Sequence, residues 1–235
     1  MSARSMLRFL PVVLAFLLVL GDVSAQATDA PKRPLVEVNT SLGRMVIALY
    51  NETPEHRDNF LRLVNEHYYD STLFHRVLPG AMLIGGDPAS RNADDRHKVL
   101  GRGEAGTTLA PEIRPGIIHL KGALGMARDD SHPASDRRSH GAYFYIVQGQ
   151  DWSPSELRLV EQKRALQDPD HATPYTPEQV RAYATNGGAP RLDGEYTVFG
   201  QVLEGMDVLD RIAALPCDNS DRPLTDVRIW MRVLQ

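Results

Sequence analysis

The chain has 235 residues, with 26 lysine and arginine residues against 30 aspartate and glutamate residues and a formal net charge of −4. A mildly acidic chain of this length has enough residues for one domain with a sizeable core, and it gives no reason to expect nucleic acid or an anionic membrane as a partner. Its single cysteine, Cys217, excludes an internal disulfide.

The first 25 residues have the order of features that is typical of a secretory signal peptide. Arg4 and Arg8 form a short basic start, residues 9–20 are an apolar run, and residues 23–25 read Val-Ser-Ala, a small-x-small cleavage site. The apolar run is shorter than the roughly 20 residues that a transmembrane helix needs, and an uncleaved membrane anchor is the alternative interpretation.

This pattern predicts three parts of the chain: a signal peptide over residues 1–25, a flexible polar leader over residues 26–34, and a folded domain over residues 35–235. We therefore expect the mature protein to be periplasmic or secreted, with no stable membrane insertion after cleavage.

The folded part opens with alternating apolar residues at 35–38 and 45–49, on either side of a turn that contains Gly43. Alternation on both sides of a glycine-bearing turn predicts a β-hairpin. Apolar residues then recur at helical spacing over residues 54–68, with proline at the first position, so we expect a helix there that Thr53 caps.

Short strand-like stretches separated by glycine follow, and a second helix fits Met206 to Ala214. Many short strands with two separated helices suggest a closed β-barrel that is capped by helices. The strand-like stretches are residues 73–78, 81–85, 123–127, 143–148, 197–202 and 227–233.

Residues 153–190 interrupt this β pattern. Residues 153–156 (Ser-Pro-Ser-Glu) and 176–179 (Thr-Pro-Glu-Gln) each have the signature of a capped helix start, and Gly187-Gly188 supplies a stop. The segment is short and polar, so we interpret it as a two-helix insertion that does not support the barrel.

Four motifs occur in an order that identifies a family. They are FHRVLPGAMLIGGDP at 74–88, GALGMA at 122–127, GAYFYI at 141–146 and LDGEYTVFGQVLEGMDVLD at 192–210. Together they resemble the cyclophilins, which are peptidyl-prolyl cis/trans isomerases. The resemblance implies a mainly β fold, a closed eight-stranded antiparallel β-barrel capped by two helices, and an enzyme that assists the folding of exported proteins by acting on X–Pro bonds.

Isomerisation of an X–Pro bond needs few chemical groups. Rotation must cross a barrier of about 18–20 kcal/mol because twisting destroys the amide resonance, but no bond is made or broken. A donor aimed at the prolyl nitrogen, which gains a lone pair in the twisted state, binds the transition state better than either ground state. The resemblance implies that Arg76 is this catalytic donor.

The resemblance also implies a set of residues that bind the substrate polypeptide. An apolar pocket holds the proline ring, and a groove beside it holds the flanking peptide. By position in the motifs these residues are His75, Ala81, Met82, Ile84, Ala127, Arg128, Tyr143, Tyr145, Leu192 and Tyr196.

At four positions this sequence departs from the cyclophilin pattern. Ala81 replaces a phenylalanine, Ile84 and Tyr143 each replace a glutamine, and Arg191 stands where the cyclosporin-binding members carry tryptophan. Loss of the aromatic wall at Ala81 and of the amide at Ile84 predicts a slower turnover.

Two alternative functions remain open. A catalytically weak cyclophilin-like domain would serve as a polypeptide-binding or chaperone module, which the residues at Ala81 and Ile84 favour. A metal or hydrolase site in the histidine- and aspartate-rich segment 129–140 is the second alternative, although its Asp, Ser and Pro content is also typical of a solvated loop and no zinc-ligand spacing is present.

We expect neither cofactor nor metal, and we expect a monomer whose partners are proline-containing polypeptides. Because arginine stays protonated at all relevant pH values, activity through Arg76 should vary little between about pH 6 and pH 8 and should survive chelators.

Overall fold

The computed structural model describes residues 32–93, 99–103 and 107–234, so the predicted signal peptide and most of the predicted leader lie outside the described residues. The first strands, β1 (Leu35–Thr40) and β2 (Gly43–Leu49), pair as an antiparallel hairpin, as predicted. Gly43 has φ 133°, and a Cβ atom there would lie 2.9 Å from Val208, so this turn needs glycine.

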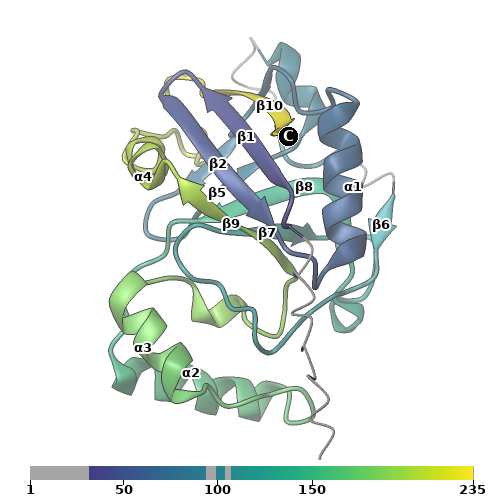
Figure 1. The fold of residues 1–235 in the computed structure, drawn as a ribbon. Coiled ribbons are helices and arrows are strands. Elements are labelled where there is room, and N and C mark those ends of the chain that lie inside the picture. The colour runs from purple at the N-terminus through teal and green to yellow at the C-terminus, as the bar shows by residue number, and fades with distance from the viewer. Residues whose placement is uncertain (1–31, 94–98, 104–106, 235) are drawn as a thin grey trace, which may run out of the picture. The chain divides into compact units, whose positions relative to one another are not determined.

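The strands of the described residues form one antiparallel sheet of ten strands in the order β3-β10-β1-β2-β9-β7-β8-β5-β4, with β6 paired to β8 (Figure 1). Beyond the hairpin, the strands are β3 (Thr72–Leu73), β4 (Arg76–Leu78), β5 (Met82–Gly85), β6 (Thr108–Leu109), β7 (Ala123–Arg128), β8 (Ser139–Val147), β9 (Val198–Glu204) and β10 (Arg228–Leu234).

This sheet differs from the eight strands in a closed ladder that the sequence predicted. Its path ends at β3 and β4, and no ladder joins these two strands within the described residues. The predicted stretch 73–78 divides because the chain changes partners there, β3 pairing with β10 and β4 with β5. The two-residue strand β6 is too short to have a recognisable alternation.

Two helices pack on the main hydrophobic core. α1 (Pro54–Asn65) buries Phe60, Leu63 and Val64, and α4 (Met206–Ala213) buries Val208 and Leu209 among its core residues. Three short 3₁₀ helices, η1 (Pro88–Asn92), η2 (Ala134–Asp136) and η3 (Pro190–Leu192), complete the connections. Within the part of the chain that is described, no helix has both the length and the apolar character that a membrane span requires.

The N-terminus of α1 is capped differently from the prediction. Thr53 occupies the N-cap position but its hydroxyl makes no capping bond, and it has no hydrogen-bond partner among the described residues. The carboxylate of Glu112 instead accepts from the backbone N–H groups of Glu55 at 3.2 Å and His56 at 2.9 Å. The cap therefore comes from a residue that is distant in sequence and invisible to a local pattern.

Residues 153–190 contain α2 (Pro154–Gln167) and α3 (Pro177–Asn186), and each begins with the predicted capping box. Figure 1 shows them as neighbouring helices that are separate from α1 and α4. They share a small buried cluster with the segment before β7: the buried members are Trp152, Leu157, Val160 and Tyr183, and Ile118 and Leu120 pack against them. The two helices thus pack on the segment before β7 and bury part of it.

Alternation along β5 and β8 separates two faces of the sheet. Leu83, Phe144 and Ile146 belong to the main core. Met82 and Tyr145 belong to a second, smaller cluster, because successive side chains of a strand point to opposite faces. The second face is where the predicted site residues gather.

Candidate active site

Arg76 lies in a row of three side chains across neighbouring strands. In the antiparallel register Arg76 of β4 is opposite Ile84 of β5, and Ile84 is opposite Tyr145 of β8. Directly opposed residues point to the same face of a sheet. The Arg76 side chain is 51% exposed, so its guanidinium is open to solvent beside the face that carries Ile84 and Tyr145.

Five of the predicted substrate-binding residues belong to one apolar cluster on this face. Tyr145 is its buried centre, with 2% of its surface exposed. The rings of Tyr145 and Tyr196 meet edge to face, with centroids 6.1 Å apart at 87°. The predicted residues that the structure brings together here are Met82, Ile84, Tyr145, Leu192 and Tyr196.

His75 and Tyr143 do not join this cluster. Tyr143 packs in the main core, stacks on His140 at a centroid distance of 3.8 Å, and accepts a hydrogen bond from the backbone N–H of Gly103 at 2.9 Å. Burial, together with the charge of Arg76, lowers the pKa of His75 to about 4. The structure places these two side chains outside the cluster around Tyr145, and their contact with a substrate stays a prediction.

The three remaining predicted residues lie around the cluster. Ala127 packs against the main core. Arg128, at the end of β7, pairs with Glu195 at 2.9 Å and lies over the ring of Tyr196 at 4.8 Å. Ala81 is half-buried and directly precedes β5, and its carbonyl accepts from the backbone N–H groups of residues 148 and 149.

A buried hydrogen-bond chain, which the sequence did not predict, reaches Tyr145. Asp193 follows Leu192, and its carboxylate accepts from the backbone N–H of His119 at 2.9 Å and from His119 Nδ1 at 2.6 Å. Because a carboxylate only accepts, Nδ1 carries the proton, and His119 Nε2 forms a hydrogen bond with the Tyr145 hydroxyl at 2.8 Å. This chain holds the ring of Tyr145 in place.

The same carboxylate connects the site to the 153–190 segment. Tyr175 donates to Asp193 at 2.7 Å and Tyr183 donates at 2.5 Å. Burial on its own raises the pKa of Asp193, but the hydrogen bonds from His119 and the two tyrosines hold it below its usual value. Sequence patterns missed Asp193 because an Asp-Gly pair is a common turn signal.

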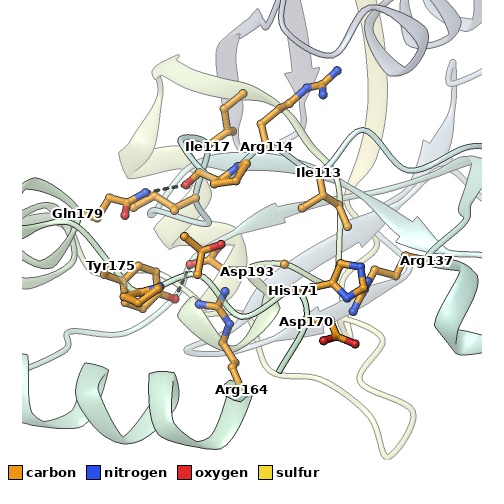
Figure 2. Close-up of a pocket in the computed structure, with 15 residues that line it drawn as sticks. Ile113, Arg114, Ile117, Arg137, Arg164, Asp170, His171, Tyr175, Gln179 and Asp193 are labelled. Atoms are coloured by element: carbon orange, nitrogen blue, oxygen red, sulfur yellow. Dashed lines mark hydrogen bonds between the residues drawn. The ribbon is translucent and has the colours of Figure 1, made fainter. Parts of the chain in front are cut away.

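A cavity of about 310 Å³ lies between residues 113–118 and the segment that links α2 to α3 (Figure 2). It does not lie at Arg76. Ile117 lines the cavity and also packs against the cluster around Tyr145, so the two adjoin. Figure 2 shows Arg164 extending from α2 toward this space, and its Nη1 atom is buried without a hydrogen-bond partner among the described residues.

The histidine- and aspartate-rich segment 129–140 is a compact turn in the structure. Asp129 is buried and accepts from the backbone and hydroxyl of Ser131, and from His132 at 2.5 Å. Ser139 and His140, which we expected in the loop, begin β8. Among the described residues, no group of three or more histidine, cysteine, aspartate or glutamate side chains is arranged to hold a metal ion.

Comparison with known proteins decides the family. The family model described as cyclophilin type peptidyl-prolyl cis-trans isomerase/CLD matches residues 35–232. The chain belongs to this family. The predicted isomerase assignment is confirmed, and the inactive binding module is the less favoured alternative.

Two curated relatives illustrate the similarity. The chain is 31% identical over 199 residues to a Neurospora crassa protein named peptidyl-prolyl cis-trans isomerase-like 1, covering 83% of this chain and 90% of the relative. It is 33% identical over 199 residues to a Streptococcus pyogenes protein whose name pairs a phosphatase with a peptidyl-prolyl cis-trans isomerase. The match covers 83% of this chain but only 37% of that longer protein.

A solved structure shares the fold. The crystal structure of a Cryptosporidium parvum cyclophilin aligns with a TM-score of 0.59 at 22% identity, over 86% of this chain and 98% of the other. A second structure of that protein was obtained in the presence of the dipeptide Ala-Pro, and it aligns with a TM-score of 0.58. The sheet and helices described above are thus those of the cyclophilin fold.

Proposed function

We propose that this cyclophilin isomerises X–Pro bonds with Arg76 as the hydrogen-bond donor to the prolyl nitrogen. The observation that carries the proposal is the row formed by Arg76, Ile84 and Tyr145, which puts an exposed guanidinium next to an apolar cluster on one face of the sheet. The presence of Ala-Pro with the Cryptosporidium parvum cyclophilin supports a proline-containing ligand for this class of site.

The chemistry follows from the state that the site must stabilise. As the peptide bond twists, the prolyl nitrogen becomes pyramidal and gains a lone pair, which accepts a hydrogen bond that the planar amide nitrogen cannot accept. The guanidinium donates that bond, so it lowers the energy of the twisted state more than that of either isomer. The proline ring would meanwhile rest on Met82, Leu192 and Tyr196, which hold it while the preceding peptide group turns.

Substitutions separate these two roles. Arg76→Ala should lower kcat for a short proline peptide by on the order of a hundredfold or more, because one preorganised donor to a transition state is worth about that much. Met82→Ala should act mainly on KM, because it removes apolar contact with both isomers. If Arg76→Ala retains the kcat of the unmodified protein, the proposed role of Arg76 is wrong.

We further propose that the isomerase acts outside the cytoplasm on exported polypeptides. The support is the basic start, apolar run and cleavage site of residues 1–25. N-terminal sequencing of the protein from its natural source should find a first residue near Gln26. Recovery of the intact chain from Met1 in the cytoplasm would contradict the export proposal and leave the isomerase proposal untouched.

We propose that the 153–190 segment influences which polypeptides enter the groove. Contact with a side chain that flanks the proline is supported by the cavity of about 310 Å³ beside the Tyr145 cluster and by Arg164 Nη1, which has no hydrogen-bond partner in the described part of the chain. Arg164→Ala should therefore change the order of kcat/KM among peptides that differ beside the proline, whereas Arg158→Ala on the exposed side of α2 should not.

We also propose that the mature protein is a monomer. Light scattering of the mature protein should therefore give the mass of one chain.

A further inference from the structure

The proposed catalytic arginine is held by a carboxylate that the family motif does not include. Arg76 Nε donates to Asp221 Oδ2 at 3.0 Å, and Nη2 lies 2.9 Å from the same oxygen. Asp221 is 145 residues away in the sequence. The interaction therefore uses one side of the guanidinium, the side that carries Nε and Nη2.

The strand next to Arg76 supplies no such partner. Ile84 is directly opposite Arg76 in the β4–β5 ladder, and its side chain has neither a donor nor an acceptor. The resemblance described above implies a glutamine at this position. Within the sheet, then, the polar partner that the motif implies is missing, and the carboxylate of Asp221 approaches Arg76 from a loop instead.

This loop is built to hold Asp221 in place. The backbone carbonyl of Asp221 accepts from the backbone N–H of Val77 at 2.8 Å, and Val77 is the residue after Arg76. The side chain of Asp218 accepts from the backbone N–H groups of Ser220 and Arg222, and Arg222 is 4% exposed. Asp221 itself has φ 61°, a left-handed conformation that aspartate, asparagine and glycine tolerate better than most residues.

We propose that Asp221 is the positioning residue for Arg76 and takes over the role of the glutamine that Ile84 replaces. The inference rests on the proposed function of Arg76. An arginine has five N–H donors in a rigid fork. With Nε and Nη2 engaged by Asp221, the Nη1 side is the one presented to the prolyl nitrogen.

The contact with Asp221 should increase kcat because it holds Arg76 in the orientation that the transition state needs. A free arginine side chain samples many rotamers, and a donor that is already oriented when the peptide bond twists loses less entropy in reaching the transition state. We expect removal of the carboxylate to lower kcat by on the order of tenfold while KM changes less than about twofold, because the contact acts on the transition state and not on substrate binding.

The test is a double-mutant cycle between Asp221 and Ile84, measured as kcat and KM on a short proline peptide. Asp221→Gly removes the carboxylate and tolerates the left-handed backbone, and Asp221→Asn keeps the shape but removes the charge. Asp221→Gly should lower kcat by on the order of tenfold with Ile84 in place, whereas in the Ile84→Gln background the same change should lower kcat much less, because the glutamine then holds Arg76. Asp207→Asn, which removes the exposed pair with Arg211 on α4, is the matched control and should leave kcat unchanged.

Recovery of kcat by Ile84→Gln in the Asp221→Gly variant would separate positioning from a merely structural role of the loop. A glutamine on β5 cannot repair a damaged turn at 218–222. The proposal is overturned if Asp221→Gly and Asp221→Asn both keep the natural kcat while Arg76→Ala loses it. It is also overturned if Ile84→Gln raises kcat equally in both backgrounds. Full activity of Arg76→Ala would instead contradict the proposed function itself.

Discussion

Ala81 is the residue at which the apolar half of the site departs most from the cyclophilin motif. It directly precedes Met82, whose side chain packs with Tyr145, Leu192 and Tyr196. An aromatic side chain at position 81 would add apolar surface beside this cluster for the proline ring to contact. The motif implies phenylalanine at position 81. Neither Ala81 nor the strand that follows it, β5, contributes an aromatic ring.

Ala81→Phe should therefore increase kcat/KM for a short proline peptide, mainly through a lower KM. Partial burial of the new ring is worth about 1 kcal/mol, which corresponds to about fivefold in affinity. Ala165→Phe, at an exposed position of α2, is the control and should have no effect. Slower turnover in Ala81→Phe would mean that an existing side chain already fills this part of the pocket.

His75 precedes Arg76, and its burial has a consequence for stability. Its pKa is lowered from the usual 6.5 to about 4, so the unfolded chain binds this proton at a higher pH than the folded chain does. The free energy of unfolding should consequently decrease as the pH falls from about 6.5 to about 4, by up to about 3 kcal/mol from this residue.

Urea denaturation at pH 7, 5.5 and 4.5, together with an NMR titration of His75, measures this effect. Hydrogen bonds from Arg232, Arg44 and Asn39 lower the pKa of Glu37 to about 2. The stability that Glu37 contributes is therefore lost at lower pH, between about pH 4.5 and pH 2, and can be told apart from the effect of His75. A His75 that titrates above pH 6 in the folded protein would contradict this account.

At the residue scale the motifs predicted which side chains gather, but not how they are held. Met82, Ile84 and Tyr145 followed from their motif positions, because alternation on β5 and β8 puts them on one face. Tyr143 packs in the main core and does not join the Tyr145 cluster, so its role and that of His75 in substrate binding stay predictions. Contacts such as the one between Arg76 and Asp221 join residues far apart in sequence, and no local pattern encodes them.

Among the elements, α1 gives the sharpest contrast between local and tertiary capping. The hydroxyl of Thr53 makes no capping bond, whereas the carboxylate of Glu112 accepts from the backbone N–H of His56 and from His56 Nδ1 at 2.7 Å. Removal of the hydroxyl from an ordinary N-cap threonine lowers the free energy of unfolding by about 1 kcal/mol. The geometry of this helix leads to a different expectation.

Thr53→Val should leave the free energy of unfolding unchanged or slightly raised, because it removes a buried hydroxyl that has no partner among the described residues. Glu112→Ala should lower it by about 1–3 kcal/mol, because the backbone donors of α1 and the ring of His56 lose their acceptor. Urea denaturation of both variants measures the difference. A larger loss in Thr53→Val than in Glu112→Ala would contradict the assignment of the cap.

The other elements show where sequence patterns suffice. α2 and α3 begin where their capping boxes predicted, because in those helices the cap is made by residues three apart. The hairpin of β1 and β2 followed from alternation and Gly43. β6, the start of β8 and the division between β3 and β4 depend on strand partners elsewhere in the chain, and so they were missed.

At the scale of the whole molecule, the 153–190 segment makes more buried contacts with the rest of the domain than its polar sequence suggested. Tyr175 and Tyr183 donate to the buried carboxylate of Asp193, which in turn holds His119 behind Tyr145. The sequence predicted an insertion that does not support the barrel. These contacts lead us to expect that removal of the segment leaves the buried carboxylate of Asp193 with fewer donors.

Deletion of residues 156–188 with a short linker should therefore lower the free energy of unfolding by at least about 3 kcal/mol, since each lost hydrogen bond to a buried charged group is worth roughly 1.5–3 kcal/mol. The double variant Tyr175→Phe with Tyr183→Phe keeps both helices and should show most of this loss, whereas Tyr50→Phe should show little. Unchanged stability in the deletion variant would restore the sequence-based view of a peripheral insertion.

The central claim is that an exposed arginine beside an apolar cluster performs the isomerisation. The most direct measurement is kcat/KM on a short proline peptide for the natural protein and for Arg76→Ala, both checked for the same thermal unfolding midpoint. The account predicts measurable isomerase activity in the natural protein and a loss of on the order of a hundredfold or more in Arg76→Ala. Equal activity of the two folded proteins would contradict it.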